Sequence, residues 1–521
     1  MTVRTIHLGD IIEVLADAIP DKPALITAAD QLTYRQLDER ATRLANHLRQ
    51  VGIVAGDHVA IHAMNCPEWV EAFYACIKLR AVPININFRY VESELAHLYD
   101  DADAVASIVA AEFVDRVPSL HHRLVIGDDY EAALAAASPE RDVDERSPDD
   151  HYIVYTGGTT GMPKGVVWRQ EDIVLGAMNA MRYGRPLERV EDLGDEAEAA
   201  PGQLRLMGLG PMMHGGSQWV MGNTHVAGGV FVLYTGRRFD ARDVLELAAR
   251  SQATMISTIG DAMARPIAEA LLAPDPPAVD LTNLLAIGNG GAPLSTAVRE
   301  QLRAALPNVT IIDSYGASET GSTGTRPDAG EGFASPRFHT GPDVAVFDDQ
   351  LRRCGPGEVG MLARTGHIPL RYHKDPDKTA TTFPVIDGAR WVIPGDFARL
   401  EEDGSVSVRG RGSVSINSGG EKIHPEEVEA ALVRHDAVFD AAVVGTPSDR
   451  WGEQVTALVQ RRPGHDVSAD ELRAHCRTSM ADFKVPKEIV FVESVPRTPV
   501  GKLDYEQVRD EVLGRLGGEG E

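Results

Sequence analysis

The stretch YTGGTTGMPKGVV, residues 155–167, gathers glycines, threonine hydroxyls and one lysine in a short loop. Glycine permits close backbone approach, and hydroxyl, amide and ammonium donors suit phosphate oxygens. The nucleotide P-loop is excluded, because Lys164 follows Pro163 and precedes Gly165 instead of Ser or Thr. A plain strand-to-helix turn explains such a run equally well when it stands alone. The candidate phosphate-binding residues are Thr156, Gly157, Gly158, Thr159, Thr160, Gly161 and Lys164.

A second turn, DSYGASETG (313–321), places an aromatic ring, hydroxyls and a carboxylate together. Tyr315 could stack on a base, and Glu319 could hold the Mg²⁺ that accompanies ATP, since this ion takes one or two carboxylates beside phosphate oxygens. Asp396, after the glycine turn of WVIPGDFARL, suits two ribose hydroxyls. The alternatives are a capped turn with a solvated Glu319 and an ordinary surface aspartate.

These turns follow apolar runs that read as strands. Between residue 151 and about 315, six such runs alternate with helical segments, which predicts an α/β fold with a parallel sheet covered by helices. Ligands of such sheets lie beyond the carboxyl ends of the strands. We therefore expect TGGTTG, GNGGAP and YGASETG to converge at one edge. The acidic stretch 188–202 is interpreted as a solvated surface insertion.

The chain has 521 residues, which favours more than one domain. An amphipathic helix begins near Thr33 and Gln36, which have capping-box spacing. After the glycine-rich junction near residue 411 the pattern changes to a compact α+β unit. We predict a large N-terminal domain over 1–410, with parallel or mixed sheets, and a small mobile C-terminal α+β domain over 411–521.

Composition narrows the function. A net charge of −26 argues against a nucleic-acid or anionic-membrane surface. The four cysteines lack metal-ligand spacing, and no apolar run is long enough to span a membrane. We expect a cytoplasmic protein without a transmembrane segment.

Seven motifs share an order and spacing with one superfamily: YTGGTTGMPKG, PMMHGG, GGAPLS, DSYGASETG, WVIPGD, GRGSVSINSGGEKIHPEEVE and PRTPVGK. From about Tyr34 to Lys502 the chain resembles the adenylate-forming, AMP-binding superfamily, specifically its acyl-CoA synthetases. NFRYVE (87–92), GDAMARP (260–266) and GRGSVSINSGGEK resemble actinobacterial fatty-acyl and sterol-side-chain CoA ligases.

The resemblance implies a two-step reaction of lipid catabolism. A carboxylate attacks the α-phosphate of Mg·ATP to give an acyl-adenylate and diphosphate, and the thiol of coenzyme A then displaces AMP. The expected substrate is a fatty acid or a steroid side-chain acid. ATP, Mg²⁺ and CoA are the implied cofactor and cosubstrates, and a homodimer is one option for the assembly.

The resemblance also assigns roles to residues. The glycine-threonine loop cradles the phosphates, the GGAP turn and the start of DSYGASETG enclose adenine, and Glu319 holds Mg²⁺. Lys502 acts in adenylation from the small domain, and a glycine strip admits pantetheine once that domain rotates. The residues implied at these nucleotide and CoA positions are Gly291, Ala292, Pro293, Asp313, Ser314, Tyr315, Gly316, Ser318, Asp396, Arg411, Ser418, Gly419 and Gly420.

Several of these positions have competing interpretations. His214 either gates the acyl pocket or is a structural histidine, and general-base chemistry is the weakest option because a carboxylate is already deprotonated. Lys502 alone would read as a surface charge, and the glycine strip as a hinge. Ser413 and Val414 replace the charged hinge residues common in the family, and Tyr505 replaces a common arginine.

Three functions remain open. The leading one is an acyl-CoA synthetase. The others are an adenylating enzyme that loads a carrier protein and an inactive nucleotide-binding relative. A wide acyl pocket is expected around Gly260.

Overall fold

The computed structural model describes residues 5–141, 145–157, 162–179, 182, 185, 187–292, 294, 296–327, 337–411, 416–462, 464–496 and 505–517. Within these ranges the largest sheet has fifteen strands. In sheet order they are β19 (Val385–Ile386), β20 (Ala389–Val392), β17 (Val359–Thr365), β21 (Asp396–Leu400), β22 (Val406–Arg411), β15 (Arg337–Thr340), β14 (Gly321–Pro327), β13 (Thr310–Ala317), β12 (Ala286–Asn289), β11 (Met255–Thr258), β9 (Arg205–Gly208), β10 (Val230–Leu233), β1 (Pro23–Ile26) and β2 (Gln31–Thr33), with β16 (Val344–Phe347) beside β17.

The middle of this sheet confirms the predicted parallel arrangement. Strands β10, β9, β11, β12 and β13 pair in parallel, and the intervening helices are α9 (Ala241–Arg250), α10 (Gly260–Leu272) and α11 (Thr296–Ala305). Apolar side chains of these strands and helices form one buried cluster, which includes Ile256, Ile287 and Val298. The carboxyl ends of the strands therefore meet on one side, as the position of the polar turns requires.

The strand before the glycine-threonine loop does not belong to this parallel sheet. β7 (His151–Gly157) pairs antiparallel with β8 (Pro163–Arg169), and both join β18 (Arg371–Tyr372) in a separate three-stranded sheet. The loop thus connects two antiparallel strands, and the strand-to-helix interpretation was wrong. Periodicity could not reveal this, because a short apolar run looks the same in either kind of sheet.

A third sheet covers the N-terminal side of the molecule. Its four parallel strands are β4 (Val82–Asn85), β3 (His58–His62), β5 (Ala104–Ala110) and β6 (His122–Ile126). Helix α2 (Tyr34–Gln50) contains the predicted capping box: Thr33 Oγ1 accepts the Gln36 N–H at 3.2 Å, and Gln36 Oε1 accepts the Thr33 N–H at 2.9 Å.

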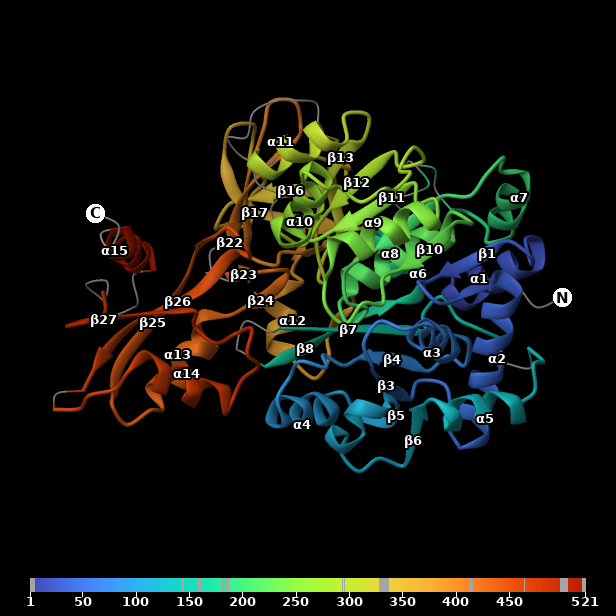
Figure 1. The fold of residues 1–521 in the computed structure, drawn as a ribbon, viewed down its shortest axis with the longest axis horizontal. Coiled ribbons are helices and arrows are strands. Elements are labelled where there is room, and N and C mark those ends of the chain that lie inside the picture. Colours follow the sequence, from blue (N-terminus) through green and yellow to red (C-terminus); the bar gives the residue numbers. More distant parts are fainter. Residues whose placement is uncertain are drawn as a thin grey trace.

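The C-terminal unit lies at one end of the molecule, coloured orange to red in Figure 1. Its sheet contains β24 (Glu421–Ile423), β23 (Ile416–Ser418), β26 (Gly452–Arg461), β25 (Val438–Ser448) and β27 (Glu488–Val492). Its helices are α13 (Pro425–Val433), α14 (Ala469–Arg477) and α15 (Tyr505–Gly517). A separate buried cluster around Val428, Val443 and Leu472 makes this the compact α+β unit that the change of pattern predicted.

The remaining described helices cover the sheets. They are α1 (Leu8–Ala18), α3 (Pro67–Lys78), α4 (Glu92–Asp101), η1 (Ala111–Arg116), α5 (Asp128–Ala136), α6 (Gln170–Ala177), α7 (Glu191–Ala199), α8 (Gly215–Val226) and α12 (Pro376–Thr382). The acidic stretch is only partly solvated, because α7 buries Leu193 and Ala197 and packs on α1. None of the helices in the described ranges is both long and apolar enough to cross a bilayer.

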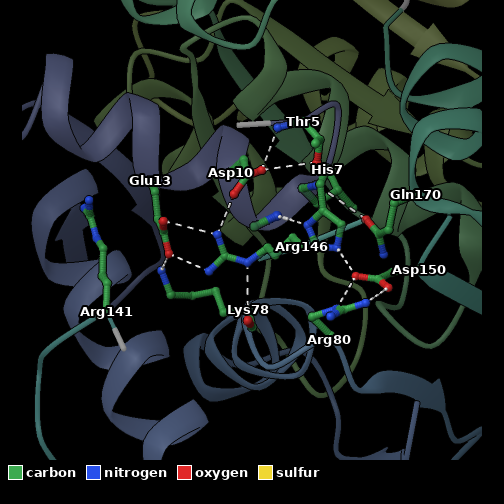
Figure 2. A network of polar contacts seen from close by, with 12 residues as sticks. Thr5, His7, Asp10, Glu13, Lys78, Arg80, Arg141, Arg146, Asp150 and Gln170 are labelled. Atoms are coloured by element: carbon green, nitrogen blue, oxygen red, sulfur yellow. Dashed lines mark hydrogen bonds and ion pairs between the residues drawn. The ribbon is translucent and has the colours of Figure 1, made fainter. Parts of the chain in front are cut away.

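A buried ionic network joins α1 to α3 and to the segment before β7 (Figure 2). The Arg146 guanidinium donates to Asp10 at 2.6 Å and to Glu13 at 2.7 Å, and the Lys78 ammonium contacts Glu13 and lies 2.7 Å from Asp38. Burial alone would raise the pKa of Glu13, but Lys78 and Arg146 together lower it to about 2. The network therefore needs Glu13 ionised.

His7 adds a second acid-sensitive group to this network. Its Nδ1 accepts the Gly9 N–H at 3.0 Å at the start of α1, and its Nε2 lies 3.4 Å from Asp150 Oδ2. Burial lowers the pKa of His7 below its usual value. Protonation of His7 is consequently less favourable in the folded protein than in the unfolded chain.

We expect the free energy of unfolding to fall as the pH is lowered from about 6.5 toward about 3. The unfolded chain binds protons at His7 and then at Glu13 within this range, whereas the folded network resists both. Glu13→Gln should cost about 3 kcal/mol at neutral pH and lose less further stability below about pH 5. Urea unfolding at a series of pH values measures this, with the exposed Glu39→Gln as control. An unchanged pH dependence in Glu13→Gln would contradict it.

Candidate active site

One cavity of about 520 Å³ lies where the three regions of the fold meet. Thr156 of β7, the end of β13 and Gly420 of the C-terminal unit border it, and α8 lines its apolar part. Gly291, Ser314, Tyr315, Gly316 and Ser318 also line this cavity, so most described residues of the predicted nucleotide turns share one space.

The strand β13 explains which of its side chains reach the cavity. Alternate residues of a strand point to opposite faces, so Ile312 and Ser314 face the cavity while Asp313 faces away. The buried Asp313 carboxylate accepts from Arg299 at 2.7 Å and from Asn289 at 3.1 Å. Asp313 thus holds β12, β13 and α11 together, and among the residues expected around adenine its side chain is not brought to the cavity.

Glu319 lies just beyond β13, next to the sheet that carries the glycine-threonine loop. Its side chain is buried and accepts the Tyr372 hydroxyl hydrogen at 3.0 Å, and the Trp168 indole N–H donates to the Ser318 carbonyl at 3.0 Å. Tyr372 pairs with Val166 of β8. Glu319 is therefore fixed relative to the two strands that flank the loop.

Lys164 lies on β8, after the loop, with its ammonium paired to Asp375. Asp375 is the N-cap of α12, where its carboxylate also accepts the Lys378 N–H at 2.9 Å. A phosphate near Lys164 would have to share the ammonium with this carboxylate.

Asp396 and Arg411 are brought directly opposite one another. They are cross-strand partners at the ends of β21 and β22, and Asp396 is buried. The spacing along the sequence did not predict this pairing.

His214 is the N-cap residue of α8 and is half-buried at the cavity. Its Nε2 lies 3.2 Å from Glu421 Oε1, and the Arg89 guanidinium donates to the same oxygen at 2.5 Å. Burial alone would raise the pKa of Glu421, but His214, Arg89 and Lys484 lower it to about 2. The sequence analysis quoted NFRYVE and SGGEK yet assigned no role to Arg89 or Glu421.

The strip Ser418–Gly420 contacts the N-terminal unit at the same place. Gly419 and Gly420 have φ values of +60° and +88°, and a Cβ on Gly420 would lie 2.4 Å from Ile259. Both the backbone conformation and the close approach therefore require glycine there. The neighbouring Asn417 side chain donates to the Gly291 carbonyl.

Several candidate residues fall outside the described ranges. They are Gly158, Thr159, Thr160, Gly161, Pro293, Ser413, Val414 and Lys502. For Gly157 and Arg411, and for Ala292 apart from its backbone, the geometry that matters here is that of the main chain. Asn289 Nδ2 donates to the Ala292 carbonyl at 3.1 Å.

Comparison with known proteins decides the family. Residues 12–369 match the AMP-binding enzyme family, and residues 427–502 match the AMP-binding enzyme C-terminal domain. The chain belongs to the AMP-binding enzyme family.

Two curated relatives of this AMP-binding enzyme are similar over nearly their full length. The "3-oxocholest-4-en-26-oate--CoA ligase" of Rhodococcus rhodochrous is 42% identical, covering 97% of this chain and 96% of the relative. The "Medium/long-chain-fatty-acid--CoA/3-oxocholest-4-en-26-oate--CoA ligase" of Mycolicibacterium smegmatis is also 42% identical, with the same coverage.

The fold is confirmed by solved structures. A double mutant of o-succinylbenzoate CoA synthetase from Bacillus subtilis superimposes with a TM-score of 0.81 at 24% identity, covering 96% of this chain and 98% of that one. The mixed α/β architecture with a large N-terminal and a smaller C-terminal unit is thus that of adenylate-forming enzymes.

The apolar part of the cavity in this AMP-binding enzyme lies between α8 and the parallel strands. Trp219, Val220 and Asn223 line it from the helix, and Ser257 and Met255 line it from β11. Gly208, Ser257 and Gly288 are in register on three adjacent strands, which makes a row of small residues about 10 Å wide.

The expectation that Gly260 provides this width was wrong. Gly260 is buried, does not line the cavity, and has a φ of +56°. Its N–H donates to Asn289 Oδ1 at 2.8 Å. The glycine is therefore needed for the turn into α10, and the small residues of β9, β11 and β12 open the pocket instead.

The donor set at Glu319 fits Mg²⁺ held together with substrate phosphates. In the described ranges no group of three or more His, Cys, Asp or Glu side chains could hold an ion without a substrate. One carboxylate beside a phosphate-sized opening is the pattern that this ion commonly uses. When bound, Mg²⁺ would offset charge on the phosphates near Glu319.

Proposed function

We propose that this AMP-binding enzyme is an ATP-dependent acyl-CoA synthetase that converts a carboxylic acid, ATP and CoA into an acyl-CoA, AMP and diphosphate. The observation that carries the proposal is the single cavity bordered by the nucleotide turns, an apolar chamber and a glycine of the small domain. A reaction that joins a hydrophobic acid first to a nucleotide and then to a thiol needs these three parts at one point.

In the first step, an oxygen of the acid attacks the α-phosphate and diphosphate leaves. We assign Thr156 to Gly161 and Lys164 to the phosphates, Asp396 and Arg411 to the ribose, and the turns at Gly291–Pro293 and Ser314–Gly316 to adenine. Fixed donors at developing charge lower such barriers. Asp313 acts in this scheme by positioning β13, because Arg299 and Asn289 occupy its carboxylate.

In the second step, the CoA thiol attacks the acyl carbonyl and AMP leaves. The thiol must reach the mouth of the cavity past Ser418–Gly420, where the glycine backbone lies against Ile259. Glu421 and Arg89 orient His214 at this mouth. We assign His214 to positioning the acyl group, since a carboxylate nucleophile needs no general base near neutral pH.

We propose that the acid is a fatty acid or a steroid side-chain carboxylate. Two considerations support this class: the names of the two actinobacterial relatives, and a chamber that runs along α8 from His214 to Asn223. Nine residues of helix span about 13 Å. The row Gly208, Ser257 and Gly288 adds width for a flat fused-ring system.

Ser257→Leu tests the proposed width. The larger side chain should fill the row of small residues and lower kcat/KM for a cholestenoate-type acid at least about tenfold, because overpacking a shaped pocket costs 1 to 3 kcal/mol. Octanoate should change less than about threefold. The adjacent Ile256→Leu, on the opposite face in the apolar cluster, is the control. Equal losses for both acids in Ser257→Leu would refute the assignment.

The activity is tested by incubating purified protein with ATP, Mg²⁺ and a panel of straight-chain, aromatic and steroid acids. Acyl-CoA formed with free CoA supports the proposal. Acyl transfer only to a carrier-protein phosphopantetheine would make the enzyme a carrier-protein ligase instead. Absence of ATP–diphosphate exchange with every acid would indicate an inactive relative.

Three further predictions concern organisation. We propose that residues 1–410 and 411–521 are the two units that move relative to each other, because β22 ends the large sheet at Arg411. The four cysteines are free thiols, which suits the reducing cytoplasm that we propose as the compartment. Homodimer formation stays a prediction.

A further inference from the structure

A buried lysine connects the two units on the side of the cavity away from the nucleotide turns. Lys484 follows α14 in the C-terminal unit and is 4% exposed. Its ammonium lies 2.5 Å from Glu94 Oε1 in α4 of the N-terminal unit and 2.7 Å from Glu427 Oε1 in α13 of its own unit. The ring of Tyr90, which lines the cavity, lies 5.0 Å from the same nitrogen.

Glu94 is committed to this contact by its own surroundings. It is 2% exposed, and its second oxygen accepts the Val91 N–H at 2.9 Å at the start of α4. Burying a carboxylate is costly unless a cation and hydrogen-bond donors accompany it. In the described structure, Lys484 is the cation that accompanies Glu94.

The charge balance makes docking depend on Lys484. Without its ammonium, docking would bring the carboxylates of Glu94 and Glu427 to one buried site, where like charges repel. Burial alone would lower the pKa of Lys484, but Glu427 and Glu94 raise it above its usual value. The lysine therefore carries its charge into the interface.

Apolar contacts locate this lysine on the docking surface itself. Ala481, three residues earlier, packs in the buried cluster of the N-terminal unit that contains Tyr90 and Leu95. The same docked orientation brings Glu421 to His214 and Gly420 to Ile259. The contact of Lys484 with Glu94 and the closure of the cavity mouth belong to one arrangement of the two units.

We propose that Lys484 is a positioning residue for the thioester-forming step: its ion pair with Glu94 holds the C-terminal unit in the orientation that places Ser418–Glu421 at the cavity mouth. This inference rests on the proposed function. The adenylation step needs Lys502, from another part of the small unit, and does not need this pair. When the units separate, Lys484 keeps Glu427 as its partner, so the contact is reversible.

The test measures the two half-reactions separately in Lys484→Met, Glu94→Gln and the wild type. Lys487→Met, three residues further along and partly exposed, is the matched control. In Lys484→Met we expect thioester formation from supplied acyl-AMP and CoA to fall at least tenfold, with ATP–diphosphate exchange within twofold of wild type. Glu94→Gln, which keeps the hydrogen-bonding shape, should show a smaller loss of the same kind.

Hydrogen–deuterium exchange gives a readout that does not require activity. Exchange should increase over residues 88–95 and 416–423 in Lys484→Met and stay at the wild-type level in Lys487→Met. Equal loss of both half-reactions, or unchanged exchange over both segments, would overturn the proposal. A wild type inactive in both half-reactions would refute the proposed function, while the exchange result would still decide the docking role of Lys484.

Discussion

Lys502→Ala is expected to lower acyl-adenylate formation by about 10²- to 10³-fold, the usual cost of removing one preorganised group at developing charge. The lysine is assigned to the phosphate oxygens that gain charge as the acid attacks. It has no assigned part once the adenylate exists. Thioester formation from supplied acyl-AMP and CoA should therefore stay within about threefold of the wild type.

The measurement is ATP–diphosphate exchange in the presence of a substrate acid, with thioester formation followed separately. The exposed Lys374→Ala, whose ammonium pairs with Asp103 on the surface, is the control. Unchanged exchange in Lys502→Ala would remove the lysine from the mechanism. Loss of both half-reactions together would point to misfolding of the small unit.

Glu319→Gln is expected to reduce exchange by at least about 10²-fold at saturating ATP, because the substitution removes a charged oxygen ligand beside the phosphates. Tyr372→Phe should have a much smaller effect, about fivefold, since it removes only the hydrogen bond that orients Glu319. A Mg²⁺ titration separates the two, because only Glu319→Gln should raise the Mg²⁺ concentration needed for half-maximal exchange by a large factor. Wild-type Mg²⁺ dependence in Glu319→Gln would exclude it as the metal ligand.

Local rules predicted much of the fold. The capping box at Thr33 and Gln36 and the apolar runs of β9 to β13 depend on residues close in sequence, and the structure confirms both. The acidic stretch was interpreted as surface because its charges dominate its composition. Leu193 and Ala197 are four residues apart and form a narrow apolar face, which is enough to hold α7 on α1.

The site was predictable only as a set of turns. Spacing placed Ser314 and Glu319 near the same sheet edge, but it could not show that Asp313 faces Arg299 or that Lys164 pairs with Asp375. Those pairings join residues far apart in the chain. Arg89 and Glu421 were missed for the same reason, since their 2.5 Å contact exists only when the two units dock.

The most direct test of the central claim follows oxygen through the reaction. Purified enzyme is incubated with ATP, Mg²⁺, CoA and an acid whose carboxylate carries two ¹⁸O atoms, and the products are analysed by mass spectrometry. An acyl-adenylate route transfers one ¹⁸O to AMP and leaves the other in the thioester carbonyl. Unlabelled AMP, or label recovered in diphosphate or inorganic phosphate, would contradict adenylation of the acid.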